Sequence, residues 1–165
     1  MVQFLSLRMP EKRSLLLRIK VKLDPTFEEG DLDSTDFVDA PNLSEEAADQ
    51  LDKFTTHVLN GEPLVGKNKP SWLDDNQNML PNTVSYKEGN YWHYHCGEYS
   101  EFQSVKNLTY DLGLNIEGLT SPSVVHYIKE SLNSIVIVGY SPQHIPFPPS
   151  DHPRKPNPLF VDIED

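Results

Sequence analysis

Two strand-forming segments separated by only four residues constrain the fold of this chain more than any other feature. Residues 123–129 and 134–140 are rich in β-branched and aromatic side chains, and the residues between them read as a hairpin connection. Because so short a connection joins antiparallel strands, we expect an antiparallel sheet. The continuous apolar run from Ile135 to Val138 indicates that the second strand lies at the sheet centre.

Two further strands and one helix complete the expected architecture. Residues 14–23 alternate apolar side chains with mostly basic ones, and residues 91–96 are aromatic, so both segments are predicted strands. Residues 44–60 carry apolar side chains on one helical face, with Ser44 as a suitable N-cap and Gly61 as a C-cap signal. We therefore predict an α+β fold in which a twisted antiparallel sheet of four to five strands carries one main amphipathic helix on one face.

Two segments fall outside these periodic elements. Residues 24–42 are acidic, contain two prolines and show no period, which predicts a solvated loop. Residues 141–165 contain seven prolines, which favours an extended, semi-rigid arm, and end in a small apolar plug at residues 159–161. The chain length of 165 residues fits a single domain spanning residues 1–165.

Composition sets expectations about compartment and partners. No apolar run approaches the roughly 20 residues needed to span a bilayer, no signal peptide is recognisable, and the single Cys96 cannot form an internal disulfide. We therefore expect a cytoplasmic protein that does not contact membranes. The net charge is −11, but eleven of the acidic residues lie within residues 24–52. An acidic surface repels nucleic acid, so this charge counts against RNA binding, although its uneven spread leaves individual faces open.

The first group of residues suited to chemistry is centred on His93 and His95. Because side chains alternate along a strand, both imidazoles and Tyr91 are expected on one face. Pairing with the neighbouring strand would bring His126 beside them, and Lys129 could supply a positive charge. Histidine is the side chain best suited to proton transfer near neutral pH, so this face is the predicted site.

Three interpretations of this face stay open. In the first, the aromatic residues and histidines serve sheet packing and are hydrogen-bonded at the edge of the core. In the second, two histidines and a cation perform acid–base cleavage of RNA. In the third, His93, His95 and His126 bind zinc and leave a fourth position open.

A second group lies in the proline-rich arm. It comprises His144 and the basic sequence Asp151-His152-Pro153-Arg154-Lys155. These residues form either a solvated arm or a histidine and two cations that close over a phosphate. Their spacing does not decide between the two.

The order of elements resembles the RelE/ParE superfamily of bacterial toxins, over roughly residues 44–145. The segment from Tyr91 to Tyr99, Tyr-Trp-His-Tyr-His-Cys-Gly-Glu-Tyr, is similar to the family's aromatic strand that runs into Gly-Asp-Tyr. Residues 124–140 resemble its β-hairpin, and residues 139–144 resemble its closing Gly-His region. The chain departs from the family in replacing first-strand arginines by histidines, in an insertion after Tyr99 and in its acidic charge.

The resemblance implies a small RNase that cuts messenger RNA, often on the ribosome, and that a cognate antitoxin neutralises. Carried onto matching positions, it implicates His93, His95, Tyr99, His126 and His144.

We therefore expect the toxin component of a bacterial toxin–antitoxin system, a metal-independent endoribonuclease that needs no cofactor. The expected catalytic residues are His93, His95, Tyr99, His126, Lys129 and His144. The expected substrate-binding residues are Tyr91, Tyr127, Arg154 and Lys155. The expected partners are a cognate antitoxin and RNA, including ribosome-bound mRNA. The alternative from another class is a non-catalytic acidic immunity protein or antitoxin, for which the acidic segment would clamp a basic toxin. A histidine-ligated zinc protein is the third hypothesis.

Overall fold

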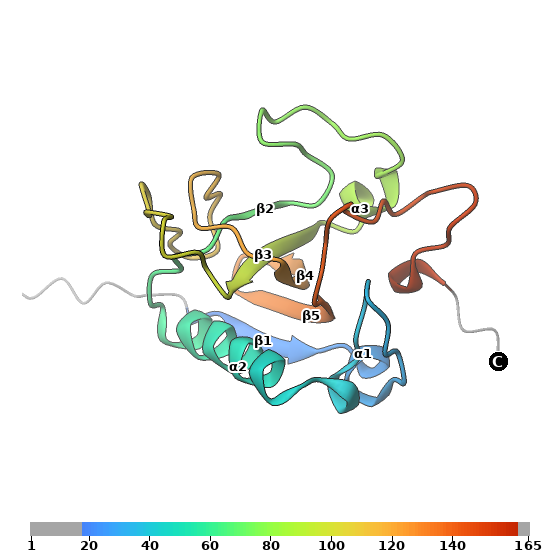
Figure 1. Ribbon diagram of the computed structural model, residues 1–165, viewed down its shortest axis with the longest axis horizontal. Coiled ribbons are helices and arrows are strands. Elements are labelled where there is room, and N and C mark those ends of the chain that lie inside the picture. Colours follow the sequence, from blue (N-terminus) through green and yellow to red (C-terminus); the bar gives the residue numbers. More distant parts are fainter. Residues whose placement is uncertain (1–17, 162–165) are drawn as a thin grey trace, which may run out of the picture.

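A computed structural model describes residues 18–161 of the chain, and they form an α+β fold (Figure 1). The sheet found in this range has five strands in the order β1-β5-β4-β3-β2. Their bounds are β1 Lys20–Leu23, β2 Asn68–Pro70, β3 Tyr91–Gly97, β4 Ser123–Ser131 and β5 Ser134–Ser141. The predicted fold class and strand number are confirmed.

The sheet is mixed rather than antiparallel throughout, so that part of the prediction is wrong. The pairs β2–β3, β3–β4 and β4–β5 are antiparallel, whereas β1 runs parallel to β5. In the β4–β5 hairpin only one edge of β5 is paired with β4. Strand β1 pairs with the other edge of β5, and helix α1, Pro25–Glu29, follows it in the chain. Of the predicted strand at residues 14–23, residues 14–17 lie outside the described residues. On the exposed side of β1, Lys22 pairs with Glu130 of β4 at 2.7 Å.

The central hairpin follows the pattern expected from its sequence. Ser131 pairs with Ser134, so only two residues, Leu132 and Asn133, form the turn. Strand β5 lies between β1 and β4, and its side chains Ile135 and Ile137 are almost completely buried. The apolar run therefore does place this strand inside the sheet, as predicted.

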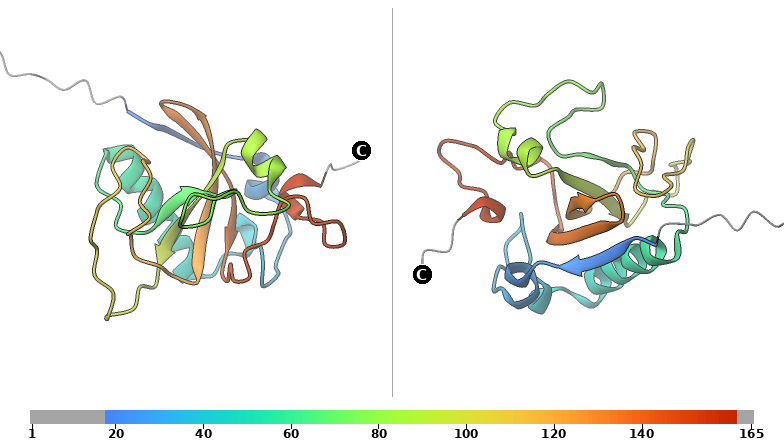
Figure 2. Two further views of the ribbon diagram at one scale, coloured as in Figure 1. Left: turned by 90° about the horizontal axis from the view of Figure 1, so that it is seen from above. Right: turned by 180° about the vertical axis from the view of Figure 1, so that it is seen from behind.

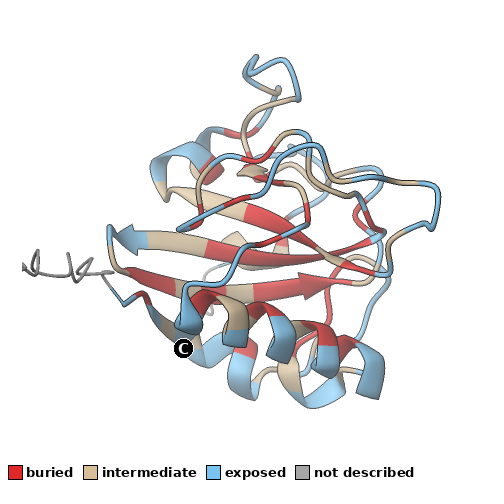
Figure 3. Cartoon of the chain, turned by 90° about the vertical axis from the view of Figure 1, so that its left-hand side faces the viewer, coloured by how far each residue is buried: buried red, intermediate tan, exposed pale blue. Residues whose placement is uncertain are grey.

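Helix α2, Glu45–Asn60, covers one face of the sheet (Figure 3). The Ser44 side chain accepts a hydrogen bond from the backbone N–H of Ala47, and Gly61 ends the helix in the left-handed conformation, so both predicted caps are present. Phe54 stacks on Tyr94 of β3 with ring centroids 4.9 Å apart. These contacts belong to the hydrophobic core between α2 and the sheet.

The acidic segment is more structured than the predicted loop. It contains the short helix α1, Pro25–Glu29, and a 3-10 turn, Ala40–Asn42. Phe27 and Phe37 are buried, and the backbone N–H of Val38 donates to the carbonyl of Tyr140 at 2.9 Å. A few apolar side chains anchor the segment to the sheet, while most of its carboxylates stay at the surface.

The opposite face of the sheet is covered by helix α3, Val84–Glu88, and by the proline-rich arm that follows β5 (Figure 2). The Tyr86 hydroxyl of α3 donates to the carbonyl of Pro148 at 2.8 Å and accepts from the Asn157 amide at 2.7 Å. At the end of the arm lies a 3-10 turn, Pro158–Phe160, and the Phe160 ring packs 4.8 Å from the Tyr91 ring. The predicted plug thus holds the arm against the sheet. Within the described residues we find no helix with the length and apolar character needed to cross a membrane.

Candidate active site

Strand β3 places two imidazoles on the face of the sheet that points away from α2. Tyr94 contacts Phe54 of α2, so its neighbours His93 and His95 point to the other side, as the strand period predicts. The two rings have centroids 5.8 Å apart. Both side chains are buried, with His93 Nδ1 3.1 Å from the Ser71 hydroxyl.

The arm brings a third imidazole to this face. His144 follows β5 by three residues, and its Nδ1 lies 2.8 Å from the carbonyl oxygen of Pro122. The His144 ring meets the His95 ring in a T-shaped arrangement with centroids 4.6 Å apart. The Phe147 ring lies 4.6 Å from the His93 ring and closes this side of the group. Three of the predicted catalytic histidines therefore converge.

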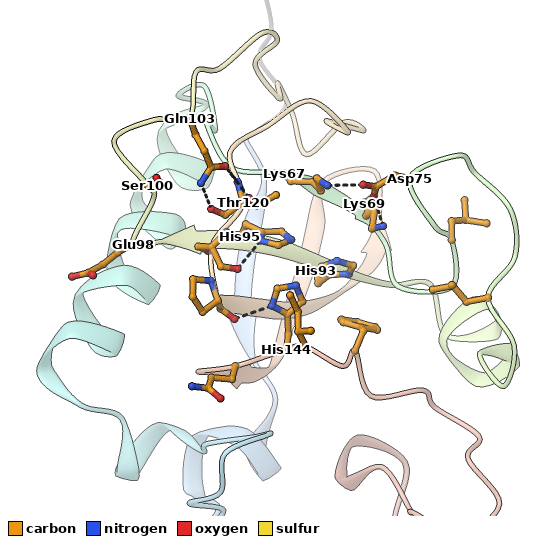
Figure 4. Close-up of a pocket in the computed structure, with 17 residues that line it drawn as sticks. Lys67, Lys69, Asp75, His93, His95, Glu98, Ser100, Gln103, Thr120 and His144 are labelled. Atoms are coloured by element: carbon orange, nitrogen blue, oxygen red, sulfur yellow. Dashed lines mark hydrogen bonds and ion pairs between the residues drawn. The ribbon is translucent and has the colours of Figure 1, made fainter.

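These rings line a cavity of about 680 Å³ (Figure 4). Its walls come from three regions that are distant in sequence, namely the segment before β3, the loop before β4 and the arm. The polar lining residues besides the histidines include Lys67, Lys69, Asp75, Glu98, Gln103, Thr120, Ser121 and Gln143. Gln103 is fixed by hydrogen bonds to the Thr120 N–H, hydroxyl and carbonyl. A cavity of this volume is within the range that binds small ligands or a nucleotide-sized group.

Two lysines lie on the upper wall of the cavity (Figure 4). Lys67 Nζ and Lys69 Nζ both contact the Asp75 carboxylate, at 2.7 and 2.6 Å, and their side chains are only 14% and 13% exposed. Two ammonium groups facing one carboxylate leave a local charge of +1 beside the histidines. Glu98, at the edge of the cavity, points away from the rings (Figure 4). This wall is suited to an anionic group.

Burial keeps the imidazoles of the cavity uncharged at neutral pH. Desolvation, followed by the neighbouring His144 charge, lowers the pKa of His95 to about 3. Desolvation, followed by the neighbouring His95 and His126, lowers the pKa of His93 well below the usual histidine value. Desolvation also lowers the pKa of His144, whereas its hydrogen bond to the Pro122 carbonyl acts in the opposite direction. Uncharged imidazoles can accept a proton, and a bound anion would raise their pKa values again.

His126 shares the face of the sheet but does not line the cavity. It pairs with His93 across β3 and β4, yet the rings of Phe37 and Phe147 lie 5.3 and 5.9 Å from its own. Its Nε2 is 2.7 Å from the Ser141 hydroxyl, and its side chain is 1% exposed. The predicted face is therefore correct for His126, but side chains from distant segments cover it.

The predicted tyrosines also lie outside the cavity. Tyr127 points into the core on the α2 side, where its hydroxyl donates to Asn68 Oδ1 at 2.7 Å. The Tyr99 hydroxyl donates to the His95 carbonyl at 2.6 Å, beside Tyr94. Tyr91 packs against the end of the arm. Each has a structural partner that the strand period alone could not reveal.

The predicted cations Lys129, Arg154 and Lys155 are also elsewhere. Lys129 lies on the α2 side, with its Nζ 3.3 Å from the centroid of the Trp92 ring, and burial lowers its pKa to about 8. Arg154 and Lys155 are exposed on the arm, and Lys155 pairs with Asp36 at 2.7 Å. The cavity takes its cations from Lys67 and Lys69 instead. Their spacing of two residues is a usable signal. The surrounding glycines and prolines nevertheless make β2, the three-residue strand that directly follows Lys67 and contains Lys69, look like a loop in the sequence.

The zinc hypothesis gains no support from the arrangement of side chains. Within residues 18–161, no group of three or more His, Cys, Asp or Glu side chains is placed to hold a metal ion. Comparisons of the chain with protein-family models, curated proteins and solved structures find no significant match. The resemblance to the RelE/ParE toxins therefore stays a prediction.

Proposed function

We propose that this cavity cleaves RNA by metal-independent acid–base catalysis and that the chain is the toxin component of a bacterial toxin–antitoxin system. The observation that carries the proposal is the pair His95–His144. Their rings meet at 4.6 Å, and each ring is held at Nδ1 by backbone groups, which leaves Nε2 as the nitrogen for a substrate.

Cleavage of RNA at a phosphodiester requires three tasks. The 2′-hydroxyl must lose a proton, the 5′-oxygen must gain one, and the charge that develops on the phosphorus oxygens must be stabilised. The two Nε2 atoms of His95 and His144 perform the proton transfers. Lys67 and Lys69 stabilise the phosphate charge, and binding of the phosphate replaces part of their contact with Asp75. No step requires a metal ion or an organic cofactor.

The acidic surface is compatible with this proposal because it lies on other elements. Exposed carboxylates occupy α1 and α2, including Glu28, Glu45, Glu46, Asp49 and Asp52, whereas the cavity lies on the opposite face of the sheet. That acidic surface is suited to a basic partner. In the toxin hypothesis this partner is the cognate antitoxin, and RNA, including mRNA on the ribosome, is the substrate.

The same acidic surface favours the second candidate, a non-catalytic immunity protein or antitoxin. In that case a basic toxin binds α1 and α2, and the histidines have no role in activity. A pull-down that recovers a basic partner, together with unchanged function after substitution of His95 and His144, would select this candidate.

The toxin proposal is tested by expression in a bacterial host and by RNA cleavage with purified protein. Wild type should arrest growth, degrade mRNA and cleave RNA in the presence of a chelator. The variants His95→Asn and His144→Asn should be inactive, because Asn keeps a side-chain amide near the Nδ1 position but has no atom at Nε2. His57→Asn, on the exposed side of α2, is the matched control and should stay active. Normal growth with intact mRNA on wild-type expression would refute the proposal.

A further inference from the structure

The two histidines of the cavity are held by different backbone groups, and this difference sets where each ring carries its hydrogen. His144 Nδ1 faces the Pro122 carbonyl at 2.8 Å, and the same carbonyl accepts the backbone N–H of His144 at 3.2 Å. A carbonyl oxygen only accepts, and a proline has no N–H to offer. The hydrogen of neutral His144 is therefore on Nδ1, and its Nε2 presents a lone pair to the cavity.

His95 has a different environment. Its Nδ1 lies 2.9 Å from both the backbone N–H and the carbonyl oxygen of Ser121, which is 5% exposed. A neutral ring can satisfy only one of them. A buried N–H without an acceptor is rarer in proteins than an underused carbonyl, so neutral His95 accepts the Ser121 N–H at Nδ1 and carries its hydrogen on Nε2.

Protonation of His95 at Nδ1 replaces this hydrogen bond by another. The protonated Nδ1 donates to the Ser121 carbonyl, which is already within hydrogen-bond distance, and the Ser121 N–H loses its acceptor. His95 therefore presents an N–H at Nε2 in both of its charge states, whereas neutral His144 presents an acceptor. The cavity contains one donor and one acceptor in neighbouring rings.

We propose that His144 is the general base and His95 the general acid of the proposed RNA cleavage. The assignment rests on that proposed function and deepens it. His144 Nε2 takes the proton of the 2′-hydroxyl as the bond from O2′ to phosphorus forms. The bound phosphate favours the protonated form of His95. Protonated His95 gives its Nε2 proton to O5′ as the bond from phosphorus to O5′ breaks, which leaves its remaining hydrogen on Nδ1, donated to the Ser121 carbonyl. The products are a 2′,3′-cyclic phosphate and a 5′-hydroxyl. Proton exchange with water then removes the added proton from His144 Nε2 and returns a proton to His95 Nε2.

The assignment is tested with RNA in which sulfur replaces the bridging 5′-oxygen at one position. A thiolate leaves without protonation, so this substrate needs a base but no acid. Loss of a general acid or base lowers the rate by about 10²–10⁴-fold, so His95→Asn and His144→Asn should both lose that much on ordinary RNA. On the sulfur substrate, His95→Asn should recover to within about tenfold of wild type, whereas His144→Asn should stay reduced by its full factor.

The outcomes separate the assignment from the proposed function. Recovery of His144→Asn instead of His95→Asn, recovery of both variants or recovery of neither would overturn the assignment while leaving RNA cleavage intact. A wild-type protein that cleaves neither substrate would refute the proposed function and the assignment with it. The variants should unfold at temperatures close to wild type, and His57→Asn should behave as wild type on both substrates.

The tautomers can also be measured without any substrate. Nitrogen NMR of the histidine rings above the pKa values should show a protonated Nδ1 and an unprotonated Nε2 for His144, and the reverse for His95. A protonated Nε2 in neutral His144 of the wild-type protein would overturn the assignment without any variant.

Discussion

The substitution Tyr127→Phe separates a structural role of this tyrosine from the substrate-binding role expected from its sequence position. Its hydroxyl is completely buried and donates to Asn68 Oδ1 at 2.7 Å. Asn68 is the first residue of β2 and lies between Lys67 and Lys69, and its own amide donates to the carbonyls of Leu112 and Gly113. Removal of the hydroxyl keeps the ring in the core but leaves a buried amide oxygen without its donor.

The expected loss of stability follows from that unsatisfied oxygen. Leaving one buried polar group without its partner costs about 1–3 kcal/mol. For a chain of this length, each kcal/mol lowers the melting temperature by about 2–4 °C, so Tyr127→Phe should melt roughly 2–12 °C below wild type. Loosening of β2 should also lower RNA affinity, because the strand contains Lys69 and directly follows Lys67.

The assay is denaturant or thermal unfolding of Tyr127→Phe beside the control Tyr110→Phe, in which the altered side chain is 59% exposed. The control should stay within about 0.5 kcal/mol of wild type, as exposed substitutions usually do. If Tyr127→Phe matches wild type in stability but raises KM for RNA, the hydroxyl contacts substrate and the structural role is wrong.

Three further outcomes are expected. Lys69→Gln should weaken binding to RNA of any sequence and lower the slope of log affinity against log salt concentration by about 0.7, whereas the control Lys155→Gln should leave affinity and slope unchanged. Equal effects of the two substitutions in binding titrations at several salt concentrations would contradict the role of Lys69 in phosphate binding. Gly66→Ala should destabilise the fold by about 1–3 kcal/mol in chemical unfolding, because the new Cβ would overlap the carbonyl oxygen of His95, and an unchanged midpoint would refute this close approach. The free energy of unfolding should fall as pH drops from 6.5 towards 3, because burial lowers the pKa values of His95 and His126 to about 3 and the unfolded chain therefore binds more protons than the folded one in this range. Each ring contributes at most about 1.4 kcal/mol per pH unit, and equal unfolding free energies at pH 7 and pH 5 would refute the prediction.

The elements that could be predicted from the sequence are those with local signals. Helix α2 has its own cap at Ser44 and its own stop at Gly61, and the β4–β5 hairpin has a short connection between two apolar strands. The parallel partner of β1 has no such signal, because it depends on which sheet edge stays open after the whole chain has folded. The acidic segment was expected to be a loop because its few apolar anchors, such as Phe27 and Phe37, show no period.

The same distinction between local and non-local signals applies to the candidate site. The common face of His93 and His95 follows from the two-residue period of a strand, which is a local property. Whether a histidine on that face meets solvent depends on distant segments: Phe147 of the arm and Phe37 of the acidic segment cover His126. Sequence period therefore predicts the face of the sheet on which the side chains lie, but not which of them line the cavity.

The chemistry of each imidazole depends on a still less local feature, the backbone group at its Nδ1. Pro122 offers only a carbonyl to His144, whereas Ser121, one residue earlier, offers both a carbonyl and an N–H to His95. Two adjacent residues of one loop thus give two identical side chains opposite hydrogen-bonding roles at Nε2. Residue type alone assigns acid–base chemistry to both histidines, and only the fold distinguishes the donor from the acceptor. For this reason, substitutions at Ser121 or Pro122 that rotate the loop should exchange or erase the two roles while every histidine is retained.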